Sequence, residues 1–176
     1  MTQPATQNRF HLGFLRVALT DQGYVGGLLV TNHLGRPLEF QCTTPVRPNR
    51  TQEILYGPTL EPFICSELIG KTLYERLGVK PQFIIVQQQN LLELRRQIEV
   101  PIGFLPDAGV ALSGDLPETS RIQFGRQILQ LHSEFPEDIS ILAPFQSRMT
   151  ADADMREPLD RVGDALKETL RAGAVA

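Results

Sequence analysis

The sequence predicts an α+β domain, in which an antiparallel β-meander packs against one long helix, with additional mixed strands and a C-terminal amphipathic helix. Three observations lead to this fold class. Three short apolar runs separated by turn signals fill residues 10–43. Apolar residues at helical spacing follow over 59–77 and again over 157–171. The chain has 176 residues and is 41% hydrophobic, which is enough for one domain with a core of its own.

The meander is predicted from its turns. Residues 1–8 are polar and are expected to form a disordered tail before the domain at 9–145. Turn signals at 21–23 and 32–37 separate the three runs, and the third run alternates apolar and polar residues like a half-buried strand. Gly26 and Gly27 interrupt the second run, which indicates either a bulge or close packing by another element.

The long helix is predicted over 59–77. Thr59 is a suitable N-cap, and Gly78 with the proline that follows ends the helix. The apolar side chains Leu60, Phe63, Ile64, Leu68, Leu73 and Leu77 approximate one helical face. Further strands are predicted at 82–87 and 101–105, whereas the pattern of 121–135 fits a strand and a helix equally well.

The last segment combines a linker with an amphipathic helix. Residues 146–156 resemble a linker, and 157–171 carry an apolar stripe. The stripe consists of Leu159, Val162, Leu166 and Leu170. We expect it to dock either on the chain's own domain or on a partner, as helices do in helix-in-groove recognition. These four residues are the predicted partner-binding site.

Charge and cysteine content limit which partners and which cellular compartment are expected for the protein. The net charge of −3 argues against nucleic acid as a partner, because phosphate binding depends on clustered basic side chains. No apolar run approaches the roughly 20 residues that span a bilayer, so no membrane association is expected. The two cysteines, Cys42 and Cys65, form no close pair, and no secretory signal precedes the domain. A cytoplasmic protein with reduced thiols is the expectation.

No catalytic constellation is recognised. Cys42 and Cys65 occupy apolar patterns, so we interpret them, together with His33 and His132, as packing residues rather than nucleophile and base. Neither a nucleophile elbow nor a phosphate-binding glycine motif is present. We therefore expect no catalytic residue and no cofactor, and the sequence weighs against an enzyme.

Acidic residues precede the last helix. Asp152, Asp154 and Glu157 could bind Mg²⁺ through oxygen ligands, or they could favour the start of that helix through its dipole. The second interpretation is preferred, and no metal site is expected.

Basic residues flank the third strand. Arg36, Arg47 and Arg50 lie on predicted loops, the second of which is stiffened by two prolines. Guanidinium groups there could bind a phosphate or an acidic partner. These three residues are the candidate anion-binding site.

The sequence therefore predicts a non-catalytic interaction or regulatory subunit of a larger cytoplasmic assembly: an adaptor that binds a protein partner or forms a homo-oligomer. The alternative is an anion- or nucleotide-binding domain, or an enzyme, with its site assembled around the Arg47 and Arg50 loop. The sequence does not indicate whether a small molecule binds.

Overall fold

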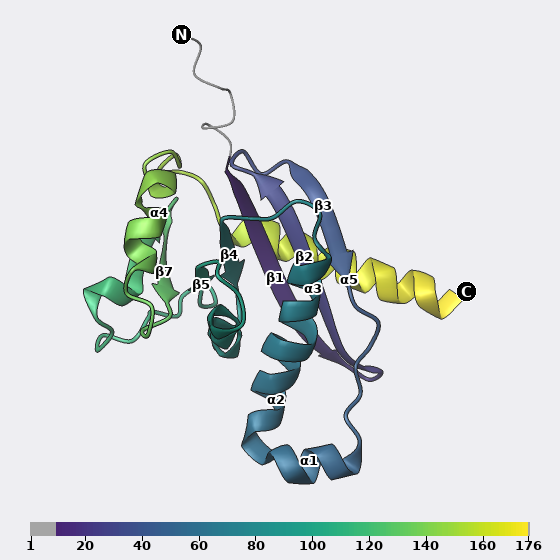
Figure 1. The fold of residues 1–176 in the computed structure, drawn as a ribbon. Coiled ribbons are helices and arrows are strands. Elements are labelled where there is room, and N and C mark those ends of the chain that lie inside the picture. The colour runs from purple at the N-terminus through teal and green to yellow at the C-terminus, as the bar shows by residue number, and fades with distance from the viewer. Residues whose placement is uncertain (1–9, 176) are drawn as a thin grey trace.

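One mixed sheet organises the protein (Figure 1). The computed structural model describes residues 10–175, so the tail predicted at 1–8 lies outside the described residues. Within them seven strands follow the order β3-β2-β1-β4-β5-β7-β6. The strands are β1 (His11–Thr20), β2 (Gly23–Asn32), β3 (Pro37–Cys42), β4 (Phe83–Val86), β5 (Ile102–Phe104), β6 (Arg121–Phe124) and β7 (Gln127–Leu131).

Antiparallel pairing dominates the sheet. β1 with β2, β2 with β3, β5 with β7 and β6 with β7 are antiparallel, whereas β4 runs parallel to both β1 and β5. The predicted α+β class and the predicted meander are confirmed. The strands predicted at 82–87 and 101–105 are β4 and β5. The segment left open at 121–135 contains the β6–β7 hairpin, which turns at Gly125 with a φ of 61°.

Helical segments connect and cover the strands. Most are short, and η3 is a π-helix while η2, η4 and η5 are 3₁₀-helices. They are α1 (Arg50–Tyr56), η2 (Gly57–Thr59), α2 (Leu60–Pro62), η3 (Phe63–Lys71), α3 (Thr72–Arg76), η4 (Gln89–Arg96), η5 (Glu118–Ser120), α4 (Asp138–Gln146) and α5 (Arg156–Val175).

The predicted long helix is present, but its internal geometry differs from the prediction. The π-helical turns of η3 bring residues five apart onto one face. Ile64 and Ile69 are accordingly buried, whereas Leu68, which we expected on the buried face, is 40% exposed. Thr59 caps no helix start, because the helical path already begins in α1 and the Thr59 hydroxyl donates to the Tyr56 carbonyl.

Each face of the sheet carries its own core. Apolar side chains of α4, α5 and the β6–β7 hairpin form one core with β1 and β4, and those of η3, α3 and η4 form the other. Figure 1 shows α3 and α5 on opposite sides of the sheet. At the glycine pair both helical layers come close. A Cβ on Gly26 would overlap Ile69, and one on Gly27 would lie 3.1 Å from Val162. The two glycines therefore permit the helices on both faces to pack closely against β2.

A buried ion pair joins η4 to the start of α4. Arg95 donates to both carboxylate oxygens of Asp138, at 2.9 and 3.1 Å, and also to the Ile98 carbonyl at 3.0 Å. The guanidinium lies 4.0 Å from the centre of the Phe135 ring. Because Asp138 is fully buried, this pair fixes α4 against the body of the domain.

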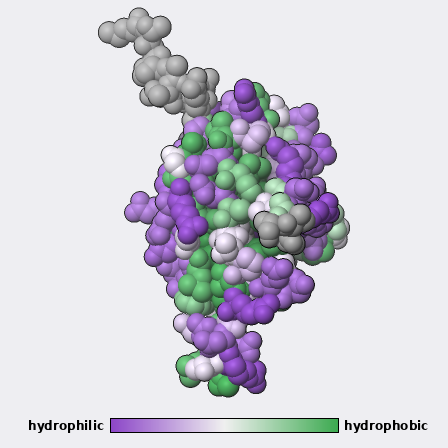
Figure 2. All heavy atoms as spheres, turned by 90° about the vertical axis from the view of Figure 1, so that its right-hand side faces the viewer, coloured by the Kyte–Doolittle hydropathy of each residue, from purple (hydrophilic) through white to green (hydrophobic). Residues whose placement is uncertain are grey.

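Helix α1 projects from the body and buries none of its residues. Asn49 caps it, accepting from the Gln52 backbone while the Gln52 side chain accepts from the Asn49 backbone. Ile54 and Leu55 are 66% and 76% exposed. Figure 2 shows hydrophobic spheres at the lower end of the molecule, where Figure 1 places this helix.

Across residues 10–175 no helix is both long enough and apolar enough to cross a membrane.

Candidate functional site

The strand order reverses between β1 and β4. The chain places β2 and β3 on one side of β1 and then returns to place β4 and β5 on the other. Because β1, β4 and β5 run parallel, their carboxyl ends meet at the same edge of the sheet. In open sheets, ligands bind outside the carboxyl ends of strands where the order reverses. The end of β4 is thus the first place to look for a site.

Two consecutive glutamines occupy this edge. The Gln88 Oε1 accepts from the Val17 backbone at 2.9 Å, which ties the end of β4 to β1. The Gln87 Nε2 donates to Asp107 Oδ1 at 3.1 Å, which ties it to the loop after β5. Side-chain amides therefore tie the end of β4 to its neighbours, and each is held in place by one bond.

A crevice of about 510 Å³ opens beside these amides. We call it the amide crevice; it is lined by Glu61, Pro62, Gln88, Gln89, Asn90 and Glu93. The Asn90 Nδ2 lies 3.4 Å from Glu61 Oε1, while its Oδ1 is buried and accepts no hydrogen bond. The Gln87 Oε1 is likewise buried and unpaired. A buried acceptor without a donor costs roughly 1–3 kcal/mol, so these oxygens are suited to a ligand that brings donors.

Cys65 lies next to the crevice and is fully buried. Burial raises the pKa of its thiol to about 12; the Glu61 carboxylate also raises this pKa, and a hydrogen bond with Asn90 opposes the increase. The thiol is therefore protonated at neutral pH and is a poor nucleophile.

The histidines singled out in the sequence lie in other surroundings. The ring of His33 packs against Phe10, with 5.5 Å between the ring centres. His132 is buried, and its Nε2 lies 3.5 Å from a Glu93 carboxylate oxygen.

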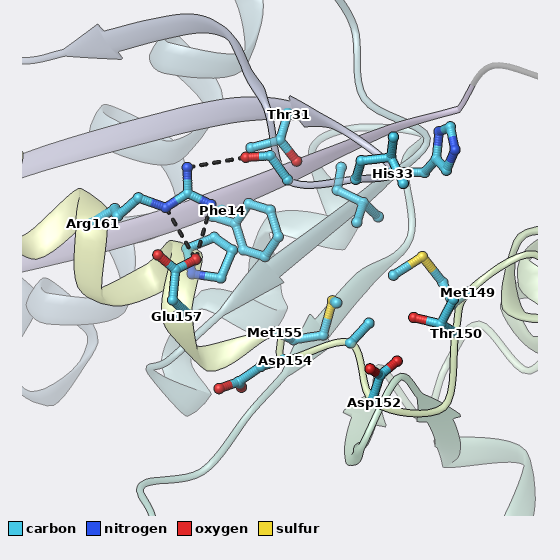
Figure 3. Close-up of a pocket in the computed structure, with 15 residues that line it drawn as sticks. Phe14, Thr31, His33, Met149, Thr150, Asp152, Asp154, Met155, Glu157 and Arg161 are labelled. Carbon is cyan, nitrogen blue, oxygen red and sulfur yellow. Dashed lines mark hydrogen bonds and ion pairs between the residues drawn. The ribbon is translucent and has the colours of Figure 1, made fainter.

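A second cavity, of about 380 Å³, contains the acidic residues just before and at the start of α5 (Figure 3). Glu157 accepts two hydrogen bonds from Arg161, at 2.9 and 3.1 Å. Asp154 accepts from the Arg156 backbone at 2.9 Å, at the start of the helix. In Figure 3 the carboxylates of Asp152, Asp154 and Glu157 point in different directions. Both bonded carboxylates thus serve the first turns of α5.

Hydrolytic metal centres need clustered ligands. Among the residues that the structure describes, no three His, Cys, Asp or Glu side chains lie close enough to hold a metal ion. Glu61 and Glu93 at the edge by β4 belong to no such cluster, so its residues do not fit such a centre.

The structure does not bring the predicted anion-binding residues together. Arg36 precedes β3, whereas Arg47 and Arg50 follow it, so they lie at opposite ends of that strand. Arg47 donates to the Asp21 carbonyl, and Arg50 pairs with Glu53 at 3.1 Å.

The predicted partner-binding stripe faces the sheet. Leu159, Val162 and Leu166 are buried in the core that α5 shares with β1 and β2, and Leu170 is half-buried. The first three side chains are therefore covered by the chain's own domain.

Sequence reasoning missed the amide crevice. The glutamines at 87–89 and Asn90 are not among the site residues predicted from the sequence. The available signal was a run of polar amides directly after the most apolar strand of the chain, which is the position that carries ligands in parallel sheets.

No family model and no curated protein matches the chain. Solved structures that resemble it include human ENDOV, with 14% identity, a TM-score of 0.52 and coverage of 98% of this chain and 89% of that one. An endonuclease V of Ciona intestinalis, in complex with DNA containing an inosine, has 8% identity and a TM-score of 0.49, with 94% and 88% covered. The endonuclease V of Bacillus subtilis has 9% identity and a TM-score of 0.45, with 98% and 84% covered.

These likenesses correct the function predicted from the sequence. The non-catalytic adaptor or regulatory subunit is wrong, because the fold is that of human ENDOV, an endonuclease, rather than of an adaptor, and with it falls the protein partner or homo-oligomer expected for such a subunit. The expectation that nucleic acid is no partner is contradicted by the same likeness to human ENDOV. Net charge misled here, since it averages over the whole surface and does not describe a local site. At 14% identity, the likeness to human ENDOV shows a shared fold.

Proposed function

We propose that the chain binds single-stranded nucleic acid and holds an unstacked base in the amide crevice. The observation that carries the proposal is Asn90, which lines the crevice beside the point where the strand order reverses and has a buried Oδ1 without a hydrogen-bond partner. Proteins recognise single strands by hydrogen bonds to the exposed edges of unstacked bases. The fold shared with human ENDOV supports the same class of ligand.

The chemistry of the crevice favours particular bases. Its lining is rich in acceptors, because Glu61 and Glu93 add carboxylate oxygens to the amide oxygen of Asn90. Carboxylates accept from the amino group of cytosine, and amides pair with adenine. Cytosine offers an exocyclic amino group where thymine offers a carbonyl oxygen. The crevice should therefore prefer cytosine over thymine.

The test compares fluorescence anisotropy of labelled deoxycytidine and deoxythymidine homopolymers of equal length, at low salt. We expect the deoxycytidine strand to bind roughly fivefold more tightly, which corresponds to about 1 kcal/mol for one added hydrogen bond. Asn90→Leu, which keeps the size of the side chain, should abolish the preference. Gln41→Leu on the edge strand β3 is the control and should keep it. Equal affinity of the wild-type protein for both strands would contradict the proposal.

We also propose a cytoplasmic location. It is supported by Cys42 and Cys65, which are both free thiols.

A further inference from the structure

Three arginines line a separate cavity of about 430 Å³. We call it the arginine pocket, after Arg121 at the start of β6, Arg126 in the β6–β7 turn and Arg156 at the start of α5. Arg156 lies at least 30 positions after the other two in the sequence. The turn at Gly125 brings them together, because it packs against Ala153 so closely that a Cβ there would overlap the Ala153 carbonyl.

Hydrogen bonds to the backbone fix two of the guanidinium groups. Arg121 Nη2 donates to the Ser113 carbonyl at 2.5 Å. Arg126 donates to the Asp152 carbonyl through Nε and Nη2, at 3.2 and 3.0 Å. Both side chains are thus held in place before any ligand arrives, which lowers the ordering cost of binding.

Donors in the pocket remain without acceptors. Arg121 Nε and Arg156 Nη1 are buried and have no hydrogen-bond partner. Leaving a buried donor of a charged group unpaired is more costly than leaving a neutral one, so such groups normally have an acceptor. The two unpaired donors belong to residues from different elements that line one cavity.

The charge balance of the pocket favours an anion. Asp107 is the carboxylate among the lining residues, and it already accepts from Gln87. Asp154 lies close enough to Arg126 and Arg156 for their charges to lower its pKa, although burial alone would raise it. It accepts from the Arg156 backbone and from Gln127. Three guanidinium groups therefore face two carboxylates that are already bonded.

We propose that the arginine pocket binds a phosphate monoester. Forked guanidinium groups match the terminal oxygens of a phosphate, which can accept several charge-assisted bonds at once. Beside the arginines the wall is apolar and partly exposed, with Val110 and Ile128 59% and 51% accessible. That wall suits the organic part of an ester. The phosphate can come from the end of a nucleic-acid strand or from a free nucleotide, and the inference does not depend on base binding in the amide crevice.

The experiment measures binding of three probes by calorimetry: adenosine 5′-monophosphate, and a short deoxythymidine strand with either a 5′-phosphate or a 5′-hydroxyl. Deoxythymidine is used because the amide crevice should bind it least. We expect the 5′-phosphate to raise affinity about tenfold over the 5′-hydroxyl, the effect of one or two charge-assisted bonds. Binding of the mononucleotide with similar affinity would identify a free nucleotide as the source, and binding of the phosphorylated strand alone would identify a strand end.

Variants connect the effect to the pocket. Arg121→Gln and Arg156→Gln should each remove most of the gain from the phosphate. The matched control is Arg148→Gln, a substitution of an exposed arginine outside the pocket. The inference is overturned if neither the mononucleotide nor the 5′-phosphate is favoured, or if both pocket variants keep the gain. Loss of the cytosine preference in the other test would leave this result unchanged, so the two failures are distinguishable.

Discussion

Breaking the buried pair between Arg95 and Asp138 should destabilise the fold strongly. We consider the substitution Asp138→Ala. It removes both charge-assisted bonds to the guanidinium and leaves a cation whose side chain is only 10% exposed. Removing one partner of a buried pair costs about 3–5 kcal/mol, because the remaining charge is neither solvated nor paired.

The size of the loss can be measured as a shift in Tm. For a chain of this length, each kcal/mol lowers Tm by roughly 2–4 °C, so Asp138→Ala should lower it by about 6–20 °C. Urea unfolding followed by circular dichroism gives the free energy directly. A double variant, Arg95→Met with Asp138→Leu, should lose less than the single variant because no buried charge remains.

The control is an exposed pair. Arg50 and Glu53 lie 3.1 Å apart, with side chains 83% and 45% exposed. Glu53→Ala should therefore change the free energy of unfolding by less than about 1 kcal/mol. If Asp138→Ala costs no more than Glu53→Ala, or if the double variant is the least stable of the set, the reasoning about the buried charge is refuted.

Three further predictions concern packing and titration. Gly26→Ala should destabilise the fold by about 1–3 kcal/mol in urea unfolding, because the new methyl overlaps a side chain of η3, whereas Gly114→Ala, in open space, should have little effect. Cys65 should resist alkylation in the native protein and react once the protein unfolds. Because the folded state holds the thiol proton more tightly than the unfolded state, the free energy of unfolding should also fall as pH rises above about 9. A Cys65→Ala variant should not show this fall. Asp154 has a pKa below its ordinary value, because hydrogen bonds and nearby arginines outweigh the effect of its burial. The stability that its carboxylate provides should therefore be present at neutral pH and be lost as pH falls below about 4. Asp154→Ala should match the wild-type Tm only in acid.

Local patterns in the sequence were sufficient to predict the meander, the helical segment over 59–77 and the C-terminal helix. Turn residues mark the ends of β1 and β2, and alternation marks β3. The pattern failed where the helix changed its own period. Leu68 fits a face with 3.6 residues per turn, but the π-helical turns of η3 bury Ile69 in its place. The spacing of five between Leu68 and Leu73 was the local sign of that change.

Neither candidate site could be predicted from local patterns. The amide crevice exists because β4 pairs with β1, about 70 positions earlier in the chain, and no short-range pattern encodes that pairing. The arginine pocket assembles Arg121, Arg126 and Arg156 across a hairpin and a helix start. Burial of an unpaired donor or acceptor is a property of the packed structure, so it cannot be read from residue spacing.

The parallel contact between β1 and β4 also has a consequence for synthesis of the chain. When β1, β2 and β3 have left the ribosome, one side of β1 still lacks its neighbour, because β4 ends only at Val86. Until then the backbone amides and carbonyls along that side are open to any other extended strand. Contacts this distant in sequence also form slowly. The nascent protein therefore passes through a stage in which one side of β1 is open to aggregation, and rapid completion of residues 83–86 ends that exposure.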